Sequence, residues 1–212
     1  MSQKINHPYF AKLLSFFAST QVKIPERIYH PDLEVYDSVK DENSLRKASV
    51  LLAVTRHTKN NKSHVVLTVR SANLKSHPGQ ISLPGGTQEE KDIDPIATAL
   101  RESQEEIGLK ADQVEIIGSL GVLALPSGFL VKPIVGLIDP GLSYTPQPEE
   151  VADIFHMPLD LVLDVSAYKK SQVEFKGVSR TILELQFEDY RVWGATAAIF
   201  YHLATEISKF YE

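Results

Sequence analysis

Three glutamates near the middle of the 212-residue chain, Glu102, Glu105 and Glu106, are spaced by three and four residues. At about 100° per residue, this spacing brings side chains to one side of a helix, so the three carboxylates could converge on one spot. Mg²⁺ and Mn²⁺ prefer oxygen ligands, and Mg²⁺ commonly takes one or two carboxylates together with waters and substrate phosphate oxygens. The trio could therefore hold a divalent metal ion that binds a phosphorylated ligand.

A solvated acidic helix face is the alternative interpretation of the same spacing. Repulsion between the carboxylates does not exclude it, since like-charge pairs at these spacings cost only about 0.2–0.5 kcal/mol each. An ion pair between Arg101 and Glu105, four residues apart, would offset roughly one such pair. The glutamates alone therefore leave both interpretations open.

A glycine-rich loop upstream of the glutamates favours the metal site. Gly85 and Gly86 follow Pro84, and fourteen residues separate Gly86 from Arg101. Glycine lacks a Cβ, so the backbone at these positions can approach a ligand closely and can expose a carbonyl oxygen to a metal ion. A plain turn is the alternative for the loop taken alone.

The glutamates need a helix to position them, and the sequence predicts one from Pro95 to Ile107. Proline suits the first turn of a helix, and Gly108 suits its end. The apolar stripe of this helix, opposite the glutamates, is expected to consist of Ile96, Leu100, Ser103 and Ile107.

Strands alternate with helices along the rest of the chain. Two apolar, β-branched runs, Ala48–Arg56 and His64–Arg70, flank a polar turn and predict a hairpin, whereas residues 71–86 are rich in proline and glycine and should be mostly loop. This pattern indicates an α/β protein with its sheet covered by helices. Further strands are predicted at residues 114–125, 129–138, 153–158, 173–175 and 181–187, and a further helix at residues 193–210.

Length and apolar content predict one domain. The chain has 43% hydrophobic residues, and we expect an amphipathic helical segment at residues 1–25 followed by a single domain at residues 26–212. Its apolar stretches are far shorter than the roughly 20 residues that span a bilayer. Because the N-terminal segment lacks the features of a secretory signal, we expect a cytoplasmic protein without a membrane partner.

Composition also narrows the chemistry and the partners. Cysteine is absent, which excludes disulfides, zinc–thiolate sites and thiol nucleophiles. The net charge of −5, from 22 basic and 27 acidic residues, argues against a nucleic-acid partner. A small phosphorylated ligand remains compatible with this charge, because a metal ion and a few basic residues can hold it. The oligomeric state is left open.

The segment from Gly86 to Leu109 resembles the box that defines the Nudix family. The second half of the box matches at Arg101, Glu102, Glu105, Glu106, Gly108 and Leu109, with Ser103 at an apolar place. In the first half, the family pattern places a glutamate at Ile93, but the nearest acids are Asp92 and Asp94, so the box is one residue longer. In the family this acid supports the box and does not take part in the chemistry.

A second resemblance points to the coenzyme A pyrophosphatases within this family, which also have an aspartate in a box of the longer form. It rests on Leu67 to Ser71, Lys75, Gly79 and Leu83 to Gly86, and downstream on Ser127 to Phe129, Val131 to Pro133, Glu150 to Phe155, Pro158 to Leu159 and Trp193 to Ala197. Lys75 stands where arginine is usual and Leu83 where phenylalanine is usual. Lysine lacks the two-pronged guanidinium, so a phosphate contact at Lys75 would be altered.

The resemblance implies a Nudix fold, an α/β/α sandwich with a mixed central sheet, in which the box forms a loop, a helix and a loop. It implies hydrolysis of a P–O–P linkage in a small-molecule nucleotide, with Mg²⁺ or Mn²⁺ as the cofactor. Glu102 and Glu106 would hold the metal, Glu105 would bind a second ion, and the carbonyl of Gly86 is a further candidate ligand.

Other roles follow from the same resemblance. Glu105 or Glu102 is the candidate base, Arg101 would orient the glutamates, and Arg70 and Lys75 are candidate contacts for the substrate phosphates. For Lys75 an ordinary surface charge is an equal alternative. His156 stands where an aromatic residue is common, and a lone histidine is more often structural than catalytic. Two alternative functions are a Nudix hydrolase of ADP-ribose, NADH or a dinucleotide, and a non-catalytic ligand sensor.

Overall fold

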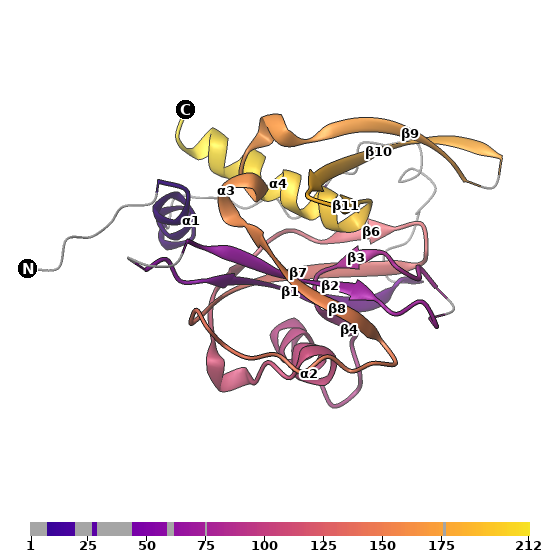
Figure 1. Ribbon diagram of the computed structural model, residues 1–212, viewed down its shortest axis with the longest axis horizontal. Coiled ribbons are helices and arrows are strands. Elements are labelled where there is room, and N and C mark those ends of the chain that lie inside the picture. Colours follow the sequence, from indigo (N-terminus) through magenta and orange to yellow (C-terminus); the bar gives the residue numbers. More distant parts are fainter. Residues whose placement is uncertain (1–7, 20–26, 29–43, 59–61, 75, 176) are drawn as a thin grey trace, which may run out of the picture.

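A mixed sheet with helices on both faces forms the centre of the molecule (Figure 1). The computed structural model describes residues 8–19, 27–28, 44–58, 62–74, 76–175 and 177–212. Helix α2 (Pro95–Ile107) covers one face of the sheet, and helices α1 (Pro8–Ala18), α3 (Leu159–Val162) and α4 (Ala195–Phe210) lie on the other. The predicted α/β/α sandwich with a mixed central sheet is confirmed.

The large sheet has the strand order β3-β2-β1-β7-β5, to which β4 adds on β1, β6 on β7 and β8 on β2. Strands β1 and β7 run parallel, whereas the other pairs in this sheet are antiparallel. The strands are β1 (Arg46–Thr55), β2 (His64–Arg70), β3 (Ile81–Ser82), β4 (Gly85–Thr87), β5 (Val114–Ser119), β6 (Leu123–Leu125), β7 (Phe129–Ile138) and β8 (Val151–Pro158).

A smaller antiparallel sheet accompanies α4 on the face away from α2 (Figure 1). Its strands are β9 (Lys169–Phe175), β10 (Val178–Phe187) and β11 (Tyr190–Trp193), with β10 in the middle. The sequence predicts β9 and β10 in part and misses β11, which is only four residues long.

Alternation along the strands supplies both faces of the large sheet with buried side chains, since successive residues of a strand point to opposite sides. On β1, Leu51 and Ala53 belong to the cluster under α2, whereas Leu52 and Val54 belong to the cluster under α1 and α4. The cluster under α2 also contains Val66, Ala99, Ile107, Leu109, Ile134, Ile138 and Val151.

The predicted elements are largely confirmed, with two corrections in the strands. The predicted hairpin forms as β1 and β2. The predicted strand at residues 114–125 is interrupted after Ser119, because Pro133 on the partner strand has no N–H group to continue the ladder. The segment at residues 71–86, predicted to be mostly loop, contains β3 and the start of β4. Strand β3 pairs with β2 and strand β4 pairs with β1, at positions where β1 and β2 do not pair with each other.

The amphipathic helix predicted near the N-terminus is found as α1. Its residues Leu13 and Phe16 are 0% and 1% exposed and pack into the main hydrophobic cluster. The predicted boundary between residues 25 and 26 lies outside the described residues and stays a prediction. In the described part of the chain, no helix combines the length and the apolar character needed to cross a bilayer.

Candidate active site

Helix α2 begins and ends at the predicted residues because local signals fix both ends. Asp94 caps the N-terminus by accepting a 2.7 Å hydrogen bond from the backbone N–H of Ala97, and Pro95 occupies the first turn. At the other end Gly108 adopts a left-handed conformation with φ of 71°, and its N–H donates to the carbonyl of Gln104. The helix is therefore held in a fixed register beneath the sheet.

The buried face of α2 differs from the predicted stripe. Ile96 is 36% exposed, so its assignment to the stripe was wrong, and the buried residues are Thr98, Ala99, Ser103, Glu106 and Ile107. Glu106 thus lies on the side that faces the sheet, and the three glutamates do not share one solvated face. On that side the backbone of Gly85 in β4 donates a hydrogen bond to this carboxylate.

Glu106 is a buried carboxylate held by glycine backbone. Glu106 is 4% exposed, and the N–H of Gly85 donates a 3.0 Å hydrogen bond to the Oε2 atom of Glu106. Burial raises the pKa of Glu106 from 4.5 to about 7, the hydrogen bond from Gly85 opposes this rise, and the negative charges of Glu102 and Glu150 add to it. A cation beside Glu106 would remove the cost of this buried charge.

Glu102 lies one turn earlier and packs against Gly86. A Cβ added at Gly86 would stand 2.6 Å from the carboxyl carbon of Glu102, so no other residue fits here without displacing that carboxylate. The side chain of Glu102 is 15% exposed. Burial raises its pKa, and the charge of Arg101 partly opposes that rise. The backbone of Gly86 and two carboxylates therefore meet at one place.

Arg101 connects the helix to the loop before it. Its Nε and one terminal nitrogen donate to both oxygens of Asp92 at 3.0 and 2.9 Å, and a terminal nitrogen also donates to the carbonyl of Thr87 at 3.0 Å. The same guanidinium pairs with Glu102 at 3.0 Å and with Glu105 at 2.8 Å. Arg101 thus contacts Glu102 and Glu105, two of the three glutamates that it was predicted to orient.

Asp92 supports the box through hydrogen bonds of its carboxylate, and Asp94 does not. Besides the two bonds from Arg101, the carboxylate of Asp92 accepts hydrogen bonds from the N–H of Glu89 at 2.9 Å and from the hydroxyl of Thr98 at 3.1 Å. The bond from Arg101 holds the pKa of Asp92 well below its usual range. The sequence leaves the two aspartates undecided, and the structure assigns the support to Asp92 and the helix cap to Asp94.

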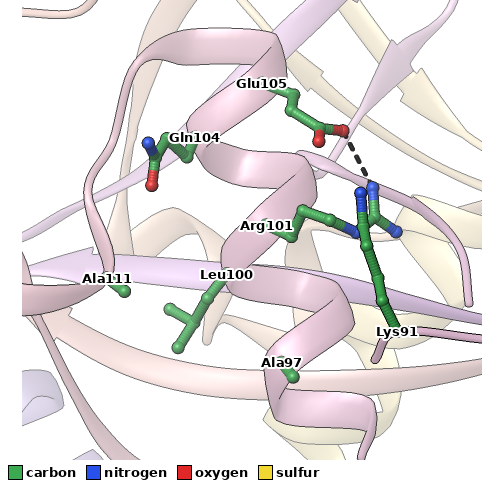
Figure 2. Close-up of a pocket in the computed structure, with 7 residues that line it drawn as sticks. All are labelled: Lys91, Ala97, Leu100, Arg101, Gln104, Glu105 and Ala111. Carbon is green, nitrogen blue, oxygen red and sulfur yellow. Dashed lines mark hydrogen bonds and ion pairs between the residues drawn. The ribbon is translucent and has the colours of Figure 1, made fainter. Parts of the chain in front are cut away.

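Glu105, unlike Glu106, is exposed to solvent. Its side chain is 53% exposed and pairs with Arg101, as Figure 2 shows. Both residues border a surface hollow of about 400 Å³ on the outer side of α2, whose lining does not include Glu102 or Glu106. Lys91, Ala97, Leu100, Arg101, Gln104, Glu105 and Ala111 line this hollow.

Of the two predicted phosphate contacts, only Arg70 can be placed. It ends β2, its positive charge lowers the pKa of Glu106, and its Nε is buried without a hydrogen-bond partner among the residues that the structure describes. A buried donor without a partner is costly, so a ligand oxygen would satisfy it. Lys75 lies outside the described residues.

Glu150 is a fourth acidic residue of this site, for which the sequence suggests no role. The loop before β8 is fastened to the end of α2, because the N–H groups of Thr145 and Gln147 donate to the carbonyls of Ile107 and Glu106 at 2.9 and 2.8 Å. The negative charge of Glu150 acts on both Glu102 and Glu106. These bonds and the pairing of β2 with β8 bring Glu150 to the site, and both join segments that are distant in the sequence.

The site offers oxygen donors that suit a divalent metal ion bound by few protein ligands. Glu102 and Glu106 offer carboxylate oxygens beside the glycine backbone, burial raises the pKa of each, and the charge of Glu102 adds to the rise at Glu106. Across the described residues, no group of three acidic, histidine or cysteine side chains stands ready to hold a metal. Two carboxylates are nevertheless enough for Mg²⁺, which keeps waters and takes phosphate oxygens from its substrate.

Several known proteins are similar to this chain. A family profile described as the NUDIX domain matches residues 45–174. The chain is 41% identical over 162 residues to an uncharacterized Nudix hydrolase NudL of Photorhabdus laumondii, covering 76% of this chain and 85% of that protein. It is 32% identical over 208 residues to a protein of the same name from Yersinia pestis, covering 98% and 100%. A crystal structure of the Nudix hydrolase RenU from M. smegmatis is 23% identical, with a TM-score of 0.47 over 56% of this chain and 74% of that one.

Proposed function

The chain belongs to the Nudix family of hydrolases, and from this premise we propose that it hydrolyses the diphosphate bond of coenzyme A or its derivatives. Its substrates are small-molecule derivatives of nucleoside diphosphates, and its catalysis uses a divalent metal ion. With coenzyme A as the substrate, the products are 3′,5′-ADP and 4′-phosphopantetheine. Mg²⁺ or Mn²⁺ is the proposed metal.

The burial of Glu106 against the backbone of Gly85 is the observation that carries the proposal. A solvated acidic helix face, the alternative interpretation, would leave this carboxylate in water, but the residue is only 4% exposed. Its charge is costly there without a cation, since burial and two neighbouring carboxylates raise its pKa to about 7. A binding role explains why an acid occupies this position.

The proposed metal ligands are Glu102, Glu106 and the carbonyl of Gly86, with Glu105 toward a second ion. When bound, the metal supplies neutralisation of the diphosphate charge and a lower pKa for the attacking water. Arg101 holds Glu102 in place through their ion pair at 3.0 Å. Phosphoryl transfer asks the protein mainly for such positioning and charge neutralisation.

Glu102 and Glu105 are the candidate bases, and the structure favours Glu102. Both pair with Arg101, but Glu102 packs against Gly86 and has a raised pKa, whereas the side chain of Glu105 is 53% exposed. In the proposed step, Glu102 takes a proton from water as the water oxygen bonds to one phosphorus. The bridging P–O bond breaks, and the bridging oxygen leaves with the other phosphate.

Substrate contacts are proposed for Arg70 and Lys75. Arg70 supplies positive charge near Glu106 and a buried Nε that has no partner in the described part of the chain.

The assignment to coenzyme A rests on the sequence resemblance at Leu67 to Ser71 and Leu83 to Gly86, which form the end of β2 and the approach to β4. These two segments therefore flank the acidic site.

A product screen tests the substrate. Coenzyme A, acyl-coenzyme A, NADH, ADP-ribose and dinucleotides would each be incubated with the protein and Mg²⁺ or Mn²⁺, and products identified by mass spectrometry. We expect 3′,5′-ADP and 4′-phosphopantetheine from coenzyme A at the highest rate. Cleavage of ADP-ribose with coenzyme A untouched would refute the coenzyme A assignment and favour another nucleoside diphosphate derivative. The cytoplasmic location expected from the sequence stays a prediction.

A further inference from the structure

Two histidines stand side by side at the end of the sheet opposite to Arg70. His64 begins β2 and His156 lies on the neighbouring strand β8, and their ring centroids are 6.2 Å apart. In the antiparallel register His64 is opposite Pro158 and Val66 is opposite His156, so the two histidines are diagonal neighbours on one face. His156, expected to be a lone structural histidine, therefore has a histidine partner.

The ring of His64 is oriented by the backbone. Its Nδ1 lies 2.9 Å from the carbonyl oxygen of Lys62. A carbonyl can only accept, so Nδ1 carries the proton in the neutral ring and Nε2 keeps a free lone pair. Metal-binding histidines are typically held in this way, with the second ring nitrogen donating to a backbone carbonyl or a carboxylate.

The ring of His156 is also restrained, and it is accessible. The ring of Tyr144 contacts it edge-on at a centroid distance of 5.5 Å. Partial burial lowers the pKa of His156, and the charge of His64 lowers it further, so the neutral ring with a free lone pair is favoured at neutral pH. The His156 residue is nevertheless exposed to solvent, which leaves a route for an ion.

The distance between the rings is close to that across a shared ion. A metal bound at about 2.0–2.1 Å from one nitrogen of each ring sets the two centroids roughly 5.2 Å apart at a tetrahedral angle and roughly 6.4 Å apart at a linear one. The observed 6.2 Å exceeds the tetrahedral value by about 1 Å, which small rotations of the two side chains can close. We propose that His64 and His156 form a second metal site, for a late transition-metal ion such as Zn²⁺, Ni²⁺ or Cu²⁺, with water completing the coordination.

The chemistry of this site differs from that of the acidic site. Imidazole nitrogen suits Zn²⁺, Ni²⁺ and Cu²⁺, whereas Mg²⁺ prefers carboxylate and water oxygens. The two sites are also apart, because His64 and Arg70 lie at opposite ends of β2, about 20 Å from each other at about 3.3 Å per residue. No third acidic, histidine or cysteine ligand joins the pair among the described residues, so the site has two protein ligands.

Calorimetric titration of Zn²⁺ into the full chain tests the site, with excess Mg²⁺ present to occupy the carboxylates. We expect one ion per chain, and His64→Gln and His156→Gln should each weaken binding by at least about tenfold, as loss of a metal-site contact does. The double variant should bind little more weakly than either single variant. His77→Asn is the matched control, because His77 is an exposed loop histidine whose φ of 56° suits asparagine. Its Zn²⁺ affinity should equal that of the wild type.

Two spectroscopic measurements on wild-type protein avoid any dependence on how the variants fold. With Cu²⁺ in place of Zn²⁺, electron paramagnetic resonance should show two imidazole nitrogens bound to one ion. Added Zn²⁺ should shift the ring resonances of His64 and His156 and leave those of His77 and His202 unchanged. Zn²⁺ affinity that is indifferent to both single variants, coordination by a single nitrogen, or equal shifts at all four histidines would overturn the proposal.

Discussion

Replacing Glu106 with Gln would separate the cost of burying this carboxylate from its use in catalysis. The pKa of Glu106 is raised from 4.5 to about 7. By linkage, this rise means that ionised Glu106 costs the folded protein about 3 kcal/mol at a pH above both values. Gln is uncharged, and its amide oxygen can still accept the hydrogen bond from Gly85. The metal-free Glu106→Gln protein should therefore be more stable than the wild type.

The pH dependence of this gain follows from the direction of the shift. Below 4.5 the carboxyl is protonated in both the folded and the unfolded chain, so the variant should gain nothing from the lost charge. The gain should grow as the pH rises toward 7 and then level off. The amide N–H group of Gln reduces it by about 1 kcal/mol if it finds no partner. Urea unfolding in excess chelator across this pH range measures the effect.

Catalysis should change in the opposite direction. Losing about 3–4 kcal/mol of electrostatic stabilisation at the transition state lowers turnover roughly hundredfold to thousandfold. Glu115→Gln is the control, because Glu115 lies on β5, its side chain is 61% exposed, and it forms an ion pair with Arg56. Its stability should change by about 1 kcal/mol or less, with turnover unaffected. Wild-type turnover of folded Glu106→Gln at limiting metal, or a stability change that is independent of pH, would refute the reasoning.

Three further predictions concern the metal and its supports. Excess chelator should abolish turnover and added Mg²⁺ or Mn²⁺ should restore it, and activity that persists in chelator would exclude the mechanism. Asp92→Asn should lower the unfolding free energy by about 1–3 kcal/mol through the lost charged bond to Arg101. Because folding lowers the pKa of Asp92, this difference should shrink in urea unfolding as the pH falls below its ordinary value of 3.8, and a constant difference would contradict the assignment. Gly86→Ala should displace Glu102 and cut turnover at least about tenfold while circular dichroism stays unchanged, and full activity would show that this close packing is dispensable.

The helix of the site could be predicted to the residue because its signals are local. Asp94 and Pro95 start α2, and Gly108 ends it. The strand pattern was predictable for the same reason, since alternation is a property of neighbouring residues. The ends of the weaker strands depend on their partners, and the break opposite Pro133 is visible only once β5 and β7 are paired.

The arrangement of the site was less predictable because it depends on contacts between distant segments. The burial of Glu106 requires β4 to lie against α2. Glu150 reaches the glutamates through the pairing of β2 with β8 and through the bonds between the loop before β8 and the end of α2. The pairing of His64 with His156 arises from the same two strands.

The parallel pairing of β1 with β7 has a consequence for folding. It joins Arg46 to Phe129 and continues to Thr55 and Ile138, so it closes a long loop that contains the glycine turn and all of α2. Loop closure over such a separation is slow compared with local hairpin or helix formation. We therefore expect metal affinity to return late during refolding, after the helical signal has recovered and only when this long-range pair has formed.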